Sequence, residues 1–123
     1  MTIPHFDADR IYIAGPMSGL PDNNRPAFFA AEKALTAAGY SVWNPVRNGL
    51  PLDAAWSEHM RVDIAALVTC GRIALLPGWE KSTGANLELK IAVALGMEDR
   101  SCIGWIMRAR NSQDMFAAAE ADK

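Results

Sequence analysis

Cysteine and histidine are scarce in this sequence, and their scarcity excludes most metal and disulfide chemistry. The 123 residues include two of each. Cys70 and Cys102 lack the spacing of metal or redox motifs, so we expect two small buried residues in a reducing compartment. No set of His, Cys, Asp and Glu has metal-ligand spacing, and the sequence therefore predicts no metal site.

Long apolar runs are also missing. None approaches the ~20 residues that cross a membrane. The first ten residues carry charged and polar groups, unlike the apolar centre of a signal peptide. The sequence therefore predicts a cytoplasmic protein with no membrane partner.

The chain has no strong excess of charge of either sign. Twelve Lys and Arg against 14 Asp and Glu give a formal net charge of -2. This balance argues against a nucleic acid polymer as the main partner, although Arg100, Arg108 and Arg110 lie close together in the sequence. Half of the residues are hydrophobic, which is ordinary for a globular protein, and the length predicts a single domain over residues 1–123.

Apolar strands and helix-favouring segments alternate along the chain. The predicted strands are 11–14, 40–43, 73–76 and 101–107, and the predicted helices are 27–38, 54–69, 83–95 and 114–121. Three strand–helix units with short connections predict a parallel sheet covered on both faces. We expect a flavodoxin-like three-layer α/β sandwich with four or five strands in the order 2-1-3-4, a fifth strand extending the edge.

Ligands of such sheets bind where the strand order reverses, at the carboxyl ends of the strands. This point lies between the first and third strands and brings loop 15–24 beside loop 77–83. The candidate substrate-binding residues are therefore Gly15, Met17, Ser18, Gly78, Trp79, Ser82 and Gly84.

The second loop allows two interpretations. Ser82, Thr83 and Gly84 are able to hold a phosphate at a helix N-terminus, or a hydroxyl simply caps that helix. Trp79 either belongs to the core or stacks on a base. The sequence contains no GxGxxG or P-loop motif, which argues against a dinucleotide or ATP enzyme.

Two carboxylates lie on apolar helix stripes. Glu88 shares its stripe with Gly84, Ala85, Ile91, Ala92 and Leu95. Asp63 likewise lies in line with Trp56, Met60, Ala66, Leu67 and Cys70. Such carboxylates either brace neighbouring loops or form a cleft pair for glycosidic chemistry, one as nucleophile and the other as acid or base. His59, one turn before Asp63, is expected to be a structural histidine.

These motifs resemble the nucleoside 2-deoxyribosyltransferase superfamily, and more closely a phage-associated group of small uncharacterised proteins within it. The resemblance extends over roughly residues 11 to 97. It is carried by Ile11-Tyr12-Ile13-Ala14-Gly15-Pro16-Met17-Ser18-Gly19, Asn44-Pro45, Asp63-Ile64, Leu76-Pro77-Gly78-Trp79-Glu80-Lys81-Ser82, Gly84-Ala85 and Glu88.

The resemblance implies cleavage or transfer of the N-glycosidic bond of a deoxynucleoside or its 5′-monophosphate. Glu88 would be the nucleophile, Asp63 the acid/base or orienting carboxylate, and Tyr12 a neighbour of the nucleophile. Ser82 and Gly84 would hold the 5′-phosphate. The resemblance also implies action without a cofactor and assembly into homodimers or larger homo-oligomers.

A non-catalytic module that binds or senses a nucleotide is the alternative. It is favoured by Asn86, where the similar enzymes usually have glycine, and by Gly71, where many have aspartate.

Overall fold

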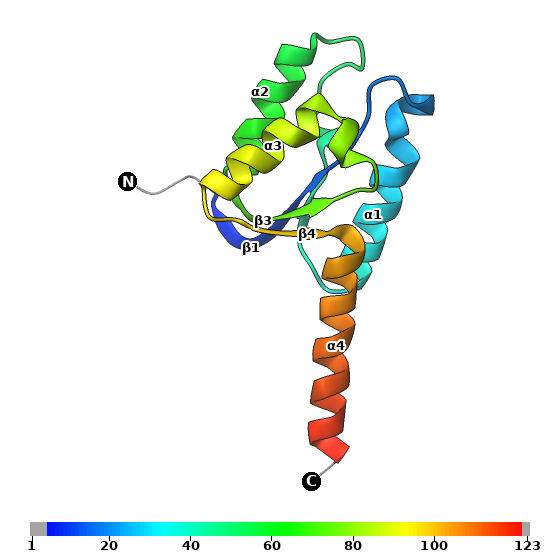
Figure 1. Ribbon diagram of the computed structural model, residues 1–123, viewed down its shortest axis with the longest axis vertical. Helices are drawn as coiled ribbons and strands as arrows, with labels where there is room; N and C mark the ends of the chain where they lie inside the picture. Colours follow the sequence, from blue (N-terminus) through cyan, green and yellow to red (C-terminus); the bar gives the residue numbers. More distant parts are fainter. Residues whose placement is uncertain (1–4, 122–123) are drawn as a thin grey trace.

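A four-stranded parallel sheet of order β2-β1-β3-β4 forms the centre of the computed structural model, which describes residues 5–121 (Figure 1). The strands are β1 (Asp7–Ala14), β2 (Val42–Trp43), β3 (Cys70–Leu75) and β4 (Glu98–Ser101). The predicted order 2-1-3-4 is therefore confirmed. The described part of the chain contains no fifth strand.

Helices cover both faces of the sheet, as a flavodoxin-like fold requires. They are α1 (Arg25–Ala37), α2 (Trp56–Leu67), α3 (Thr83–Ala94) and α4 (Cys102–Ala121). Helices α1 and α4 pack against one face, and α2 and α3 pack against the other (Figure 1). Among the helices of residues 5–121, none is both long and apolar enough to cross a membrane.

The alternation of side chains along β1 gives each face its own core. Ile11 and Ile13 point to the α1/α4 side, whereas Tyr12 and Ala14 point to the α2/α3 side. All four are completely buried. Each large side chain buried in this way stabilises the fold by about 1.5–3 kcal/mol. The same alternation turns the phenol of Tyr12 towards α3.

The first and third strands begin earlier than the apolar pattern predicts. The register between them shifts in the interval from Asp7 to Ile11, which lets the polar start of β1 join the sheet. Gly71 makes this possible, because a Cβ at this position would lie 2.1 Å from the carbonyl oxygen of Ala8. The close approach of two backbones explains the glycine at this position.

The prediction of a strand over residues 101–107 is wrong. The strand is the polar segment Glu98–Ser101, and α4 begins at Cys102 and also includes the predicted helix 114–121. Cys102 and Trp105, three residues apart, are buried, while Ile103 and Met107 are exposed, which is a helical pattern. The Ser101 hydroxyl accepts a hydrogen bond from the Gly104 N–H at 2.9 Å and caps the helix.

Candidate active site

The centre of the candidate site is a hydrogen bond between a strand and a helix. The phenol of Tyr12 on β1 donates to Oε2 of Glu88 on α3. Tyr12 is fully buried and Glu88 is 5% exposed. The structure therefore brings together two of the three predicted catalytic residues.

Burial dominates the electrostatics of Glu88. It raises the pKa of this carboxyl from 4.5 to about 8. Charged carboxylates are poorly solvated in such surroundings, and no salt bridge offsets this cost for Glu88 within residues 5–121. At neutral pH the side chain therefore holds a proton in most molecules.

Two tryptophans border this pair. The ring of Trp43 on β2 stacks on Tyr12, with 5.4 Å between the ring centroids and 9° between the planes. Trp43 is the register partner of Tyr12 in the sheet, which places the two rings one strand apart. Trp79, half-buried, packs against the same apolar cluster. The phenol of Tyr12 is thus held by an aromatic stack as well as by its bond to Glu88.

Asp63 belongs to a different hydrogen-bond network. It is 6% exposed on α2, and its Oδ1 accepts a hydrogen bond from Nδ2 of Asn48 at 3.0 Å. Burial raises the pKa of the Asp63 carboxyl, while the hydrogen bond from Asn48 acts in the opposite direction. Asn48 therefore stabilises the ionised form of Asp63.

The network also fixes the proton on His59. The Oδ1 of Asn48 accepts from the Leu50 N–H at 3.0 Å, so its Nδ2 donates both to Asp63 and, at 3.0 Å, to Nδ1 of His59. His59 Nε2 lies 3.1 Å from the Pro51 carbonyl oxygen, which only accepts. In this arrangement Nδ1 of His59 accepts and Nε2 donates to the Pro51 carbonyl.

Asp63 and Glu88 do not contact each other directly. No hydrogen bond or ion pair joins them in the part of the chain that the structure describes. Helices α2 and α3 pack side by side, and both carboxylates lie on buried sides of their helices. The arrangement leaves the two as separate groups on neighbouring helices.

The loop before α3 is held by hydrogen bonds to side chains of its own helix. The Ser82 hydroxyl accepts from the Ala85 N–H at 3.1 Å and caps the helix. The Asn86 amide donates to the carbonyls of Trp79, Glu80 and Ser82, at 3.3, 3.0 and 2.8 Å. The capping interpretation of Ser82 is therefore confirmed, and it leaves the hydroxyl hydrogen available to a ligand.

The predicted neighbouring loops lie next to each other at the carboxyl ends of β1 and β3. The Leu76 N–H donates to the Ala14 carbonyl at 2.9 Å. A Cβ at Gly15 would lie 2.7 Å from the Leu76 Cβ, so only glycine permits this approach. Gly78 has a φ of +86°, which favours glycine.

The remaining candidate substrate-binding residues have different surroundings. Met17 packs against the core cluster on the α1/α4 side of the sheet. Ser18 is exposed in its loop. Gly84 lies against α2, where an added Cβ would be 3.4 Å from the sulfur of Met60.

Sequence reasoning missed Asn48 and Trp43 as parts of the site. The pattern gives Trp43 only as a strand residue and Asn48 only as a loop residue. An Asn-Gly pair marks a turn at 48–49, but no local signal connects it with Asp63, fifteen residues later. Within residues 5–121, no group of three or more His, Cys, Asp or Glu side chains is placed to hold a metal ion.

Comparison with known families matches most of the chain to one family of unknown function. The sequence model described as "Domain of unknown function (DUF4406)" matches residues 9–98, most of the chain. The chain belongs to the DUF4406 family. All the candidate site residues lie within the matched segment, whereas α4 lies beyond it. No curated protein matches the chain.

Proposed function

We propose that this DUF4406 protein cleaves or transfers the N-glycosidic bond of a nucleoside or deoxynucleoside, or of its 5′-monophosphate, with Glu88 as nucleophile. The observation that carries the proposal is the Tyr12–Glu88 hydrogen bond. A buried carboxyl group held in one orientation by a hydrogen bond suits attack on an anomeric carbon. The resemblance to nucleoside 2-deoxyribosyltransferases supports the same assignment.

The reaction has two steps. An oxygen of ionised Glu88 bonds to C1′ of the sugar as the bond from C1′ to the base nitrogen breaks, and the base leaves with the electron pair. Asp63, whose pKa is raised, supplies the proton that the leaving base takes up. Water or a nitrogen of a second base then attacks C1′, its proton passes to Asp63, and the bond from C1′ to Glu88 breaks to restore the carboxylate. The choice of acceptor distinguishes a hydrolase from a transferase.

Ionisation of Glu88 limits this chemistry at neutral pH. With a pKa of about 8, about a tenth of the molecules carry the charged carboxylate at pH 7. The hydrogen bond from Tyr12 favours that form. The ionised fraction of Glu88 therefore rises with pH, and base release also requires Asp63 to keep its proton.

A 5′-phosphate fits the N-terminus of α3. The hydroxyl hydrogen of Ser82 and the free N–H groups of the first helical turn favour an anion at this position. We therefore propose nucleoside monophosphates as the preferred substrates. We also propose that the protein acts in the cytoplasm and, from the resemblance, that it forms a homodimer or larger homo-oligomer.

A nucleotide-binding module without turnover is the alternative function. It is favoured by the enclosure of Glu88, which is 5% exposed and largely protonated at neutral pH, and by its separation from Asp63. Such a module needs the loops of the site but not an ionised Glu88.

Measurement of free base distinguishes the two functions. The protein is incubated at pH 8 with a panel of deoxynucleosides, ribonucleosides and their 5′-monophosphates, and released base is separated and quantified. Glu88→Gln is compared with Glu80→Gln, a matched change at an exposed position of the loop. Thermal unfolding with each compound measures binding independently of turnover.

We expect the wild type and Glu80→Gln to release base and Glu88→Gln to lose this activity by at least about a thousandfold, as for removal of a nucleophile. No release by the wild type with any compound would exclude the enzymatic function. Stabilisation by a nucleotide that is retained in Glu88→Gln, without any product, would support the binding module.

A further inference from the structure

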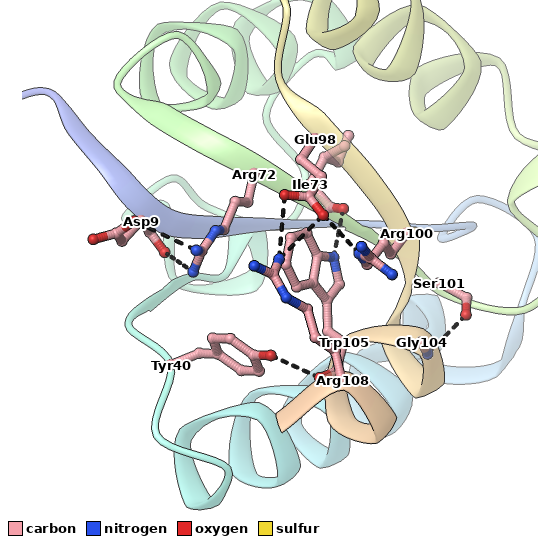
Figure 2. Close-up of polar contacts among 10 residues, drawn as sticks. All are labelled: Asp9, Tyr40, Arg72, Ile73, Glu98, Arg100, Ser101, Gly104, Trp105 and Arg108. Carbon is pink, nitrogen blue, oxygen red and sulfur yellow. Dashed lines mark hydrogen bonds and ion pairs between the residues drawn. The ribbon is translucent and has the colours of Figure 1, made fainter. Parts of the chain in front are cut away.

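Three arginines surround one buried tryptophan on the side of the sheet opposite Glu88. The guanidinium carbons of Arg72, Arg100 and Arg108 lie 5.2, 5.4 and 5.4 Å from the ring centroid of Trp105. Trp105 has no exposed surface, and its indole N–H donates to the Ile73 carbonyl at 2.9 Å. Figure 2 shows the three guanidinium groups gathered around this ring. We call these three residues the arginine cluster.

The fold brings the cluster together from three elements. Arg72 on β3 is the register partner of Glu98 on β4, and Arg100 follows two residues later, so all three side chains point to the α1/α4 face. Arg108 lies one turn after Trp105 on α4. Arg100 and Arg108 are close together in the sequence, and the pairing of β3 with β4 brings Arg72 beside them.

The carboxylates around the cluster do not balance its charge. Glu98 is shared, with its Oε2 2.7 Å from Arg100 and 3.1 Å from Arg108. Among the carboxylates that the structure describes, only Asp9 pairs with Arg72, at 3.4 Å, and its side chain is 82% exposed. Three guanidinium groups and two carboxylates leave one surplus positive charge. In Figure 2, Asp9 lies on the far side of Arg72 from Arg108, and Glu98 lies between Arg108 and Arg100.

An arginine packs on an aromatic ring elsewhere in the chain without any surplus of positive charge. Arg47 makes the same kind of contact, with its guanidinium carbon 4.8 Å from the centre of the Phe29 ring. One carboxylate, that of Glu32, accepts three hydrogen bonds from it at 2.8–3.1 Å. A single cation with a single matched anion is sufficient there, whereas the arginine cluster concentrates like charges that repel one another.

We propose that the arginine cluster binds a phosphoryl group. Guanidinium forks donate paired hydrogen bonds to tetrahedral oxyanions, and a phosphate with two negative charges matches a site with surplus positive charge. The side chains of Arg100 and Arg108 are 44% and 40% exposed, so a small anion reaches them from solvent. The fully buried indole offers no surface for stacking a base, so the site recognises the phosphoryl group itself.

This site is separate from the candidate active site. Tyr12 and Glu88 face α2 and α3, whereas the cluster lies on the face that α1 and α4 cover. Arg100 and Arg108 also lie beyond the segment that the DUF4406 model matches. The proposal therefore concerns this chain and is independent of N-glycosidic chemistry.

Titration with inorganic phosphate at constant ionic strength tests the site. The signals of the arginine Nε–H groups and of the Trp105 indole N–H are followed by ¹⁵N NMR, and potassium chloride replaces phosphate in the reference titration. Arg72→Gln and Arg108→Gln remove guanidinium groups, and Arg47→Gln is the matched control. Glu98→Gln keeps every arginine and removes the competing carboxylate.

We expect saturable shifts at Trp105 with a Kd of about 1–10 mM. Binding should weaken at least about fivefold in Arg72→Gln and Arg108→Gln, because each loses a fork of donors. It should remain unchanged in Arg47→Gln and tighten at least about threefold in Glu98→Gln, where the surplus charge doubles. Equal shifts with chloride, equal weakening by Arg47→Gln, or no tightening in Glu98→Gln would each overturn the proposal.

Discussion

The phenol of Tyr12 donates its only hydrogen to Glu88, a residue 76 positions later in the sequence. The bond links the central strand to α3 and fixes one oxygen of a buried carboxyl group. It also means that the protonation state of Glu88 affects both the stability of the fold and the chemistry of the site.

The first prediction concerns stability and pH. The folded chain keeps a proton on Glu88 up to a pKa of about 8, whereas the unfolded chain releases it near 4.5. The folded state therefore binds more protons between these values, and the free energy of unfolding falls as pH rises through this window, by at most about 1.4 kcal/mol per pH unit. Urea unfolding at pH 5 and pH 8 measures this slope.

Two variants isolate the contribution of Glu88. Glu88→Gln should lose its part of the slope and be more stable than the wild type at pH 8. Glu80→Gln, changed at an exposed position, should keep the wild-type slope. An unchanged slope in Glu88→Gln would show that this carboxyl ionises normally in the folded protein.

The second prediction compares the loss of the hydroxyl group at Tyr12 with its loss at Tyr40. Tyr12→Phe removes the donor to Glu88, so the pKa of Glu88 should rise further and stability should fall by about 1–3 kcal/mol. Tyr40→Phe removes a bond to the Trp105 carbonyl, 2.7 Å long, on the other side of the sheet. This control should cost stability without moving the pKa of Glu88, as followed by carboxyl ¹³C NMR. Equal pKa shifts in both variants would contradict the assignment.

The third prediction concerns Asn48 as a positioning residue for Asp63. Asn48→Leu removes the amide that donates to both Asp63 and His59. The pKa of Asp63 should rise further, because the bond that favours its charged form is lost. Carboxyl ¹³C NMR measures this change, and ¹⁵N NMR should show the His59 proton on Nε2 in the wild type. Asn111→Ala, at an exposed position of α4, should change neither, and a wild-type proton on Nδ1 would refute the network.

The fourth prediction compares two glycines. Gly71→Ala places a Cβ 2.1 Å from the Ala8 carbonyl oxygen, and the strands must separate. We expect a loss of about 3 kcal/mol in the free energy of unfolding. Gly84→Ala meets only side-chain atoms of Met60 and Trp56, the nearest being the Met60 sulfur at 3.4 Å, so its stability should stay within about 1 kcal/mol of the wild type. Urea unfolding of both variants distinguishes these outcomes, and a tolerated alanine at 71 would contradict the close approach.

The fifth prediction concerns the helix cap. Ser82→Ala removes the acceptor for the Ala85 N–H and should destabilise the protein by about 1 kcal/mol. If α3 also binds the 5′-phosphate, the same change should raise KM for monophosphates and leave KM for nucleosides unaltered. Ser82→Thr keeps the hydroxyl and should preserve both properties. If Ser82→Ala changes KM equally for monophosphates and nucleosides, Ser82 caps the helix but does not bind the 5′-phosphate.

The sequence predicts the fold where local pattern and tertiary contacts agree. The strand order follows from alternating strands and helices with short connections, and the structure confirms it. The edge strand β4 was missed because Glu98–Ser101 has no apolar residue to mark it. The segment after it contains Cys, Ile and Trp, which favour strands locally, yet burial of Cys102 and Trp105 on one side selects a helix.

The candidate site is only partly visible in the sequence. Helix periodicity places Glu88 and Asp63 away from solvent, and both are buried as the pattern indicates. The partner of Asp63 is not predictable, because a loop asparagine reaches a helix only through tertiary structure. The stacking of Trp43 on Tyr12 likewise depends on the register between two strands.

Asn86 has a consequence for how readily the site accepts a ligand. Its amide binds three carbonyls of the loop before α3, at Trp79, Glu80 and Ser82. The loop therefore loses its conformational freedom when the chain folds. An anion that binds there does not have to order the loop. Asn86 thus lowers the entropic cost of binding.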